Sequence, residues 1–439
     1  MLEIFHKKKA NAQMQISRKS AEIEVVTSWE KEDDTYFAPG ALVAVKNGKG
    51  VLREVMMEPA SQSMLSLMLG DKPLFQLLGD EYFCPTCEKI LRSGYGLDQP
   101  ELLRMERINE SKDKVSFSEI LEELYPLLGL LDSGYYTVWD TSLYPTDGNG
   151  HLFWEVPNEM APLPGTCVYY YGDSEYADPH PYFMVGTQPR ENYNPERVDY
   201  YRAHPGARAI AYFMDGYITA LLDGHHKAFA AALEHEKVNA LVIVPEYIAR
   251  FRGADGQMHD WLTCGGGAVF HGNKAFDCEA YRLDSNLRRT RRSAVSEELA
   301  DEVARYMEQV KLTCRFPVDT DELAKYYPSV DDVAAIDRAG AITDEGLDEW
   351  LGRIPGKGGY TEEDVCILMR ALGAMKHKRL FEMGDHFSRH NYTGDTLYVI
   401  LEAMMRLPRT PELEDYFIER MVELEDDYPR IRDLILGYW

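Results

Sequence analysis

Long apolar stretches are missing from this chain of 439 residues. No run of about 18 apolar residues occurs, so no segment is predicted to span a membrane. The first residues, Met1–Ser20, are basic and lack the continuous apolar core of a signal peptide. The seven cysteines are odd in number and scattered, which argues against a disulfide framework. These absences predict a cytoplasmic protein without a membrane contact.

Positive charge is also scarce, because 47 Lys and Arg residues face 73 Asp and Glu residues and leave a formal net charge of −26. An acidic surface repels nucleic-acid backbones. The one concentrated basic region comprises Arg282 and the run Arg288–Arg292. Such a run is more often a solvated linker or a helix start than a groove reader, so nucleic acid is not predicted as a partner.

The remaining composition is typical of a folded protein, with 45 % hydrophobic and 11 % aromatic residues. The length suits two or three domains. Composition and periodicity change near Arg288–Ser296. We therefore predict an α+β protein with a basic lead over residues 1–20, an elaborated mixed domain over residues 21–290 and an all-helical domain over residues 297–439.

The early part of the mixed domain shows strand patterns. Glu22–Thr27 alternates like a strand, and Ala41–Val45 with Val51–Val55 is predicted to form a hairpin across an Asn-Gly-Lys-Gly turn. The apolar pieces Ser61–Gly70 and Pro73–Leu78 are interpreted as helical or irregular. Residues 140–195 are rich in Pro, Gly and aromatic residues, which predicts long ordered loops over a core.

The stretch Ala207–Pro245 organises this domain. Its pattern predicts a strand, a turn at Asp215-Gly216, a second strand, a tight turn at Asp223-Gly224, an Ala-rich helix and a short buried strand closed by the proline. The turn is followed by His225, His226 and Lys227. Free backbone N–H groups, the positive end of the helix dipole, two imidazoles and an ammonium would converge there, which predicts an anion site and most naturally a phosphate site.

The sequence DGHHK at residues 223–227, with the Ala-rich helix and the strand behind it, resembles the ParB/sulfiredoxin-type fold. That family includes a CTP-binding partition protein, sulfiredoxin and ADP-dependent serine kinases, and its members hold nucleotide phosphates at this turn. The resemblance covers roughly 40 residues within 195–285 and places Lys227 where the family usually has Arg. It implies that the ligand is a nucleotide with Mg²⁺ or another phosphorylated small molecule. The residues implied to hold it are Gly224, His225, His226 and Lys227.

A nucleotide site of this kind leads to an NTPase or a phosphotransferase as the first functional hypothesis. Phosphoryl transfer needs a carboxylate that positions a nucleophile or a metal, and cations that offset the developing charge. Asp223 and His226 are the catalytic candidates, and Glu196, Asp199 and Asp215 just upstream stay open as alternative carboxylates. Asp223 equally suits the first position of a tight turn. The alternative interpretation of the whole segment is a solvated structural turn in which His225 caps the helix and Lys227 points outward.

A second motif is Cys84-Pro85-Thr86-Cys87. Two thiolates at this spacing can form half of a tetrahedral Zn²⁺ site, but no second such pair occurs in the chain. The other ligands would come from distant residues such as Cys167, Cys264, Cys278, His151 or His180. A redox dithiol and two plain thiols stay open as alternatives.

The chain from residue 297 onward has helical periodicity with clear N-terminal signals at Thr361 and Thr410. The helices are predicted to form a HEAT-like array or an ordinary bundle, and no strict repeat is evident. The second functional hypothesis is a non-catalytic protein-binding or scaffold module with a structural zinc knuckle. It would contact protein partners through the acidic helical array and the aromatic loops. The predicted helices are Thr320–Tyr327, Val330–Ala339, Asp344–Leu351, Thr361–Met375, Leu380–Arg389, Gly394–Met405, Pro411–Glu425 and Tyr428–Leu436.

Overall fold

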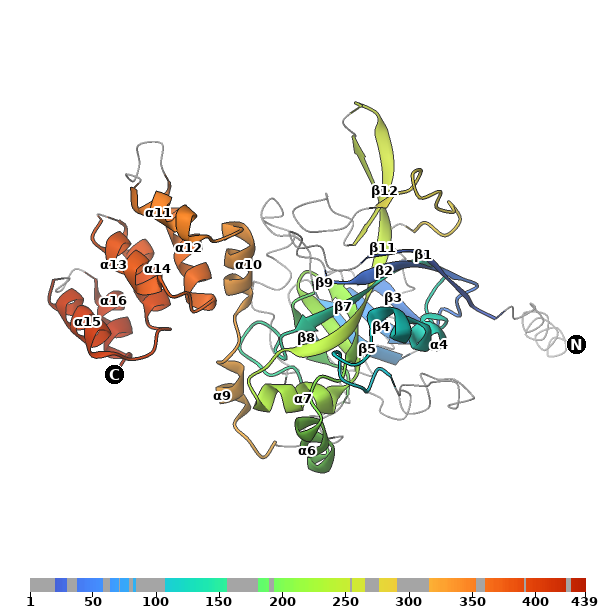
Figure 1. Cartoon of the computed structure of the whole chain (residues 1–439), viewed down its shortest axis with the longest axis horizontal. Helices are drawn as coiled ribbons and strands as arrows, with labels where there is room; N and C mark the ends of the chain where they lie inside the picture. Colours follow the sequence, from blue (N-terminus) through green and yellow to red (C-terminus); the bar gives the residue numbers. More distant parts are fainter. Residues whose placement is uncertain are drawn as a thin grey trace, which may run out of the picture. The chain divides into compact units, whose positions relative to one another are not determined.

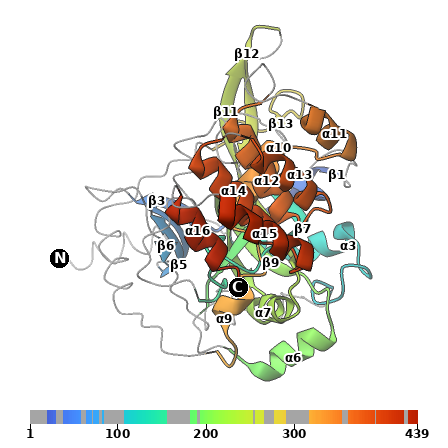
Figure 2. The same cartoon turned by 90° about the vertical axis from the view of Figure 1, so that its left-hand side faces the viewer.

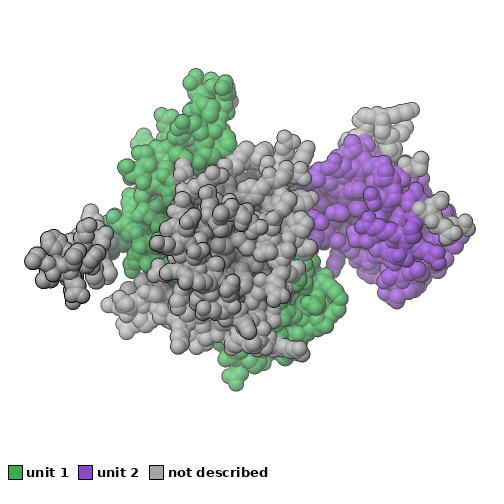
Figure 3. Space-filling model, turned by 180° about the vertical axis from the view of Figure 1, so that it is seen from behind, with its two compact units in different colours: residues 1–172, 178–327 green, residues 173–177, 328–439 purple. Residues whose placement is uncertain are grey.

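The computed structural model of the chain describes residues 20–29, 38–57, 64–70, 72–78, 82–83, 107–155, 181–188, 193–252, 255–264, 276–289, 316–352, 360–390, 392–423 and 428–439. The chain divides into two compact units, the first ending at Tyr327 and the second beginning at Pro328 (Figure 3). The first unit holds a mixed sheet with helices and the described part of the second is helical, so the α+β class is confirmed.

The division between the units falls later in the chain than the composition predicts, and residues 290–315 lie outside the described part. Aromatic contacts explain the position of the division. Phe316 packs against Phe229 with ring centroids 5.0 Å apart, and the Tyr327 ring lies 6.1 Å from that of Tyr144. The segment after residue 316, including helix α9 (Thr320–Ala324), therefore belongs to the first unit.

The first unit is built on a nine-stranded mixed sheet (Figure 1). Seven strands follow the order β1-β2-β7-β11-β9-β10-β8, while β12 pairs with the second half of β11 and β13 pairs with β12. The strands are β1 (Glu22–Trp29), β2 (Gly40–Lys46), β7 (Gly134–Leu143), β8 (Phe183–Gly186), β9 (Ala209–Asp215), β10 (Ile218–Asp223), β11 (Val238–Arg252), β12 (Met258–Cys264) and β13 (Phe276–Asp277).

The predicted order of elements in the organising stretch is confirmed. Strands β9 and β10 form an antiparallel pair, the helix α7 (His225–Leu233) follows, and β11 returns parallel to β9. The prediction that the last strand ends at Pro245 is wrong, because β11 continues to Arg252. The proline lies where β11 leaves β9 and begins to pair with β12, so its missing N–H falls at a change of partners.

Helix α7 covers one face of the sheet and forms the core with it. Ala228, Phe229 and Ala232 of the helix pack on Val242 and Val244 of β11, all of them buried. A second helix, α6 (Pro195–Ala203), lies beside α7 (Figures 1 and 2). The junction between β10 and α7 is therefore held between the central strands and a second helix.

A smaller antiparallel sheet contains β3 (Leu52–Met57), β4 (Met64–Leu69), β5 (Lys72–Leu78) and β6 (Tyr82–Phe83). Two predictions are wrong here. The pieces beginning at Ser61 and Pro73 contain strands, and β2 and β3 belong to different sheets instead of forming a hairpin. The connection is bound elsewhere, since the backbone N–H groups of Lys49 and Gly50 donate to the carbonyls of Gly129 and Leu131 at 3.0 and 3.1 Å.

A short helical segment precedes β7 and is broken into turns. The sequence predicts one helix from residue 116 to 131, whereas the structure has α3 (Phe117–Leu121), η2 (Glu122–Leu124) and α4 (Tyr125–Leu128). Pro126 lies in the first turn of α4, where its missing N–H costs no hydrogen bond.

The second unit contains the helices that the sequence predicts. They are α10 (Val330–Ala339), α11 (Asp344–Gly352), α12 (Glu362–Ala374), α13 (Leu380–Ser388), α14 (Gly394–Met404), α15 (Pro411–Glu423) and α16 (Pro429–Leu436). Helices α10, α12, α14 and α16 pack side by side in that order, and α11 packs against α13 (Figure 2). Alternate helices thus form one layer.

This layer carries a sequence repeat that the periodicity did not reveal. The residues before α10, α12 and α14 are Ser329, Thr361 and Thr393, which recur at intervals of 32 residues. The Thr361 hydroxyl accepts from the N–H of Asp364 at 3.1 Å, and the Ser329 hydroxyl accepts from the N–H of Asp332 at 3.2 Å. The Thr393 hydroxyl accepts from the N–H of Thr396 in the same way, so all three repeats begin with a hydroxyl N-cap, and the first two add a reciprocal bond from the Asp side chain.

Candidate functional site

The DGHHK turn, residues 223–227, is built around a glycine in a left-handed conformation. Gly224 has φ 104° and ψ 22°, and it separates the last residue of β10 from the first residue of α7. A Cβ atom at this position would lie 2.8 Å from Cβ and 3.0 Å from Cα of Ala209 on β9. The glycine is therefore needed both for its backbone conformation and for close packing on the sheet.

His225 is turned into the protein and bonds to backbone. Its Nε2 atom accepts from the N–H groups of Thr187 at 2.9 Å and Gln188 at 3.2 Å, just beyond the end of β8. The ring packs against Trp154, with centroids 5.4 Å apart. Burial, with His226 next to it, holds the pKa of His225 well below its usual value. This geometry requires a neutral imidazole, which links the end of β8 to α7 through two hydrogen bonds.

His226 has a similar role at the other end of the connection between β8 and α6. Its Nε2 atom accepts from the N–H of Asn194 at 3.0 Å, and its ring meets the Trp154 ring edge to face at 5.4 Å. Asn194 is itself the N-cap of α6 and accepts from the N–H of Glu196 at 2.9 Å. Protonation of Nε2 would break the bond to Asn194, so this imidazole nitrogen serves to position α6 in the observed arrangement.

Lys227 also points inward. Its ammonium donates to the carbonyl of Arg208 at 2.8 Å and lies 3.5 Å from the Asp223 carboxylate, while the side chain is only 4 % exposed. Burial lowers the pKa of Lys227, and Asp223 opposes that shift. The Asp223 side chain is 40 % exposed. Of the predicted site residues, Asp223 and Lys227 are thus brought together, and the two histidines bond to the two ends of the connection between β8 and α6.

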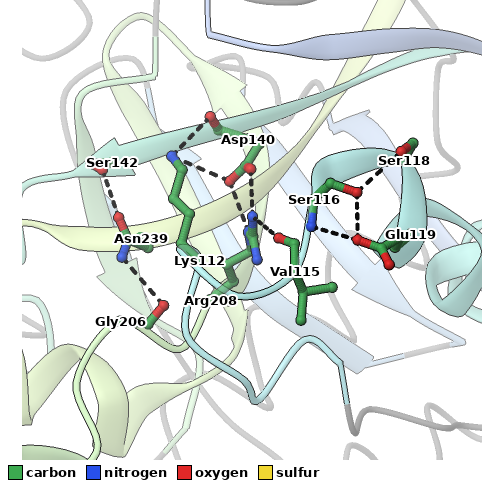
Figure 4. Close-up of polar contacts among 10 residues, drawn as sticks. All are labelled: Lys112, Val115, Ser116, Ser118, Glu119, Asp140, Ser142, Gly206, Arg208 and Asn239. Carbon is green, nitrogen blue, oxygen red and sulfur yellow. Dashed lines mark hydrogen bonds and ion pairs between the residues drawn. The ribbon is translucent and has the colours of Figure 1, made fainter.

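The carbonyl that Lys227 binds belongs to a buried arginine that sequence reasoning missed. Arg208 donates from Nε and Nη2 to the two carboxylate oxygens of Asp140 at 3.0 and 2.8 Å, and from Nη2 to the Val115 carbonyl at 2.9 Å. Lys112 approaches the same carboxylate at 3.5 Å (Figure 4). The sequence signal for this ion pair was weak: Asp140 lies inside an apolar strand, and Arg208 directly precedes another.

Metal-binding candidates receive no support from the described residues. Within them, no group of three or more His, Cys, Asp or Glu side chains is arranged to hold a metal ion. His151 bonds to Asp147 at 2.8 Å instead. Cys84 and Cys87 lie outside the described residues, so the zinc hypothesis stays a prediction.

Two arginines of the basic run are partly buried. The Arg288 guanidinium lies 3.5 Å from the Asp260 carboxylate, and the guanidinium of Arg289 is stacked 4.7 Å from the centroid of the Tyr136 ring. The rest of that run lies outside the described residues. These two side chains are engaged by the protein itself.

A second candidate site is a groove in the helical unit, here called the helical groove. It has a volume of about 500 Å³ and lies along the layer formed by α10, α12, α14 and α16. Its lining includes Arg370, Asp395, Tyr398, Glu402, Arg406 and Arg430. Several of these side chains are well exposed, with Arg430 at 72 % and Asp395 at 92 %.

Compared with protein-family models, curated proteins and solved structures, the chain matches none, so the functional assignment rests on geometry. The resemblance to the ParB/sulfiredoxin-type fold accordingly stays a prediction. Among the helices that the structure describes, none is both long and apolar enough to cross a membrane.

Proposed function

We propose that this chain is a non-catalytic binding module whose helical unit contacts a polypeptide partner. The observation that carries the proposal is the helical groove, which presents charged side chains and a tyrosine to solvent across four helices. Extended surfaces made by stacked helix pairs suit binding of a polypeptide, because one segment can touch several repeats at once.

The chemistry of the DGHHK turn favours the same proposal over an NTPase or phosphotransferase. The side chains of His225, His226 and Lys227 are directed to backbone groups of the protein. A catalytic His226 would have to give up its bond to Asn194, and a phosphate-binding Lys227 its bond to Arg208. Asp223 is the one exposed member, and a single carboxylate does not hold Mg²⁺ without further oxygen ligands.

An unbiased selection tests the binding function. The full-length protein is immobilised and challenged with a display library of random peptides, and nucleotide hydrolysis is assayed on the same preparation. We expect enrichment of peptides that compete with one another for the protein and no release of phosphate from ATP, GTP or CTP. Phosphate release with no peptide enrichment would overturn the proposal.

A second candidate function is phosphate binding at the DGHHK turn. It is favoured by the exposed Asp223 carboxylate at the amino end of α7, where helix N–H groups attract an anion and a nucleotide could bring Mg²⁺ to the carboxylate. Binding would then use the backbone of the turn and leave Lys227 in its internal role. A nucleotide with Mg²⁺ that raised the unfolding temperature would support this candidate.

We propose a zinc site at Cys84 and Cys87 independently of the two candidate functions, polypeptide binding and phosphate binding. If Cys84 and Cys87 bind Zn²⁺, elemental analysis of the purified protein should find about one metal ion per chain, and Cys84→Ser should lose it. Protein that is folded and free of zinc would contradict the assignment.

A further inference from the structure

The charges that line the helical groove are largely paired with one another. Arg370 lies 3.7 Å from Asp331. Arg406 lies 2.8 Å from Asp332, and Arg430 lies 3.5 Å from Asp395. These pairs connect α10 with α12, α10 with the end of α14, and α16 with α14. They offset the charge of the three arginines of the groove across adjacent helices, and an exposed pair of this kind contributes at most about 1 kcal/mol.

Glu402 also lines the groove and takes part in none of these three pairs. It lies on α14, is half-buried, and forms no ion pair with any residue that the structure describes. A half-buried carboxylate without a counter-charge is partly desolvated. A cation brought by a partner would therefore gain more here than at a fully exposed carboxylate.

The repeat shows that Glu402 reverses a charge. Counting nine residues from the caps Ser329 and Thr361 leads to Arg338 and Arg370, whereas the same count from Thr393 leads to Glu402. Arg338 pairs with Glu363 of the next repeat at 2.7 Å, and Arg370 pairs with Asp331. The position used elsewhere for a bond between repeats is thus acidic in the third repeat.

An aromatic side chain lies one helical turn from Glu402. Tyr398 lines the same groove, and the guanidinium of Arg430 is 4.4 Å from the centroid of its ring. The contact with Arg430 shows that this ring can hold a guanidinium against its face. A carboxylate beside a tyrosine is a suitable pair of contacts for a Lys or Arg side chain, whose stem packs on the ring while its head reaches the acid.

We infer that the helical groove binds a basic polypeptide segment, with Glu402 pairing to one Lys or Arg side chain and Tyr398 contacting its stem. This inference rests on the proposed binding function and adds the charge of the partner. The acidic surroundings favour it as well, since the whole chain has a formal net charge of −26 and would attract a basic segment from solution.

Fluorescence anisotropy with labelled synthetic peptides tests the inference on the full-length protein. Three Gly/Ser-based peptides of equal length carry several Lys residues, several Glu residues or no charge. The Lys peptide should bind and the other two should not. Glu402→Gln should weaken Lys-peptide binding roughly fivefold, the upper end for a partly exposed ion pair, and Glu402→Arg should shift the preference toward the Glu peptide.

Glu345→Gln is the matched control, because it removes the same charge from an exposed position on α11 outside the groove. It should leave the dissociation constant unchanged, and circular dichroism should show that all variants are folded. Equal weakening by Glu345→Gln and Glu402→Gln would reduce the effect to overall charge and overturn the inference.

The other outcomes separate the inference from the function it rests on. Binding of only the uncharged or the Glu peptide would overturn the basic partner while leaving polypeptide binding in place. Failure of all three peptides, with competing peptides recovered from the random library, would do the same. Failure of both the peptides and the library selection would overturn the proposed function with it.

Discussion

The DGHHK turn and the helical groove both concentrate charged and polar side chains, but they use them in opposite ways. In the turn, His225, His226 and Lys227 are buried and bonded to carbonyl or N–H groups of other segments. In the groove, most of the paired side chains are exposed, although Asp332 is buried, and Glu402 forms no ion pair with any residue that the structure describes. A motif of polar residues therefore indicates a binding surface only where burial has not already committed those residues.

The cause of the difference is the position of each region relative to a core. The turn follows a strand within the nine-stranded sheet, so its polar groups are removed from water and must be paired internally. The groove lies on a layer of helices, and buried apolar side chains of α12, α14 and α16 belong to the core of the second unit.

The largest effect is expected from Arg208, which connects the turn to the centre of the sheet. Arg208→Met removes the bidentate partner of Asp140, whose side chain is 3 % exposed. Leaving a buried carboxylate without its main counter-charge should lower the free energy of unfolding by roughly 3–5 kcal/mol. Chemical denaturation of the full chain measures the change.

Two further variants control this experiment. Arg202→Met removes an arginine that pairs with Glu234 at 2.6 Å on the surface, and it should cost at most about 1 kcal/mol. The double variant Arg208→Met/Asp140→Leu should recover much of the loss, because it removes both buried charges. Equal costs for Arg208→Met and Arg202→Met would contradict the claim that burial distinguishes the two regions.

Glu246 on β11 provides a pH-dependent test of the same burial. Its Oε1 atom accepts from the Thr137 hydroxyl at 2.6 Å, and Oε2 is buried without a hydrogen-bond partner among the described residues. Burial raises the pKa of Glu246 to about 8. Because the folded state holds this proton more tightly than the unfolded state, its contribution to stability is present below the unfolded pKa and is lost as pH rises through about 8.

Glu246→Gln should therefore gain stability relative to the wild type as pH increases. At neutral pH the difference should be roughly 2–4 kcal/mol, and it should shrink toward zero at about pH 4. Denaturation at several pH values measures it. A difference that does not change with pH would show that Glu246 titrates normally and is not desolvated.

Local structure around the turn was predictable from the sequence, whereas its contacts were not. The two glycines, the apolar runs and the Ala-rich segment determine the order strand, turn, strand, turn, helix and strand. The partners of His225 and Lys227 are Thr187 and Arg208, which the pairing of β8 with β10 and of β9 with β11 brings to the turn. No local pattern specifies such pairing over dozens of residues.

The same limit explains the wrong hairpin. Asn47–Gly50 has the composition of a hairpin turn, but its N–H groups bond to carbonyls near residue 130, and β2 and β3 separate into two sheets. The helical repeat is the opposite case, because its signal was present in the sequence. Ser or Thr caps recur every 32 residues before a helix, and comparing the helix starts at that spacing would have revealed it.

A smaller effect is expected in the helical unit, where side chains connect neighbouring repeats. Glu362 accepts from the N–H and hydroxyl of Thr393 at 3.0 and 2.7 Å and from the hydroxyl of Thr396 at 2.6 Å. These bonds, the one from Thr396 foremost, lower the pKa of Glu362. Glu362→Ala should lower the free energy of unfolding by about 1–2 kcal/mol.

The stabilising effect of Glu362 should be present above its unfolded pKa and be lost as pH falls through its lowered folded pKa. Glu363→Ala is the control, since that neighbour makes one surface pair with Arg338 and should change stability by less than about 1 kcal/mol. If the two substitutions cost the same at neutral pH, the connection between repeats through Glu362 is not important for stability.

The central claim is that the DGHHK turn is structural and that the charged surface of functional use lies in the helical unit. Thermal unfolding of the wild type and Lys227→Met, each with and without ATP, GTP, CTP or ADP and Mg²⁺, tests it most directly. We predict that Lys227→Met lowers the unfolding temperature through loss of its bond to Arg208, and that no nucleotide shifts either protein. A nucleotide that raises the wild-type unfolding temperature, together with a Lys227→Met variant of unchanged stability that no longer responds, would contradict the claim.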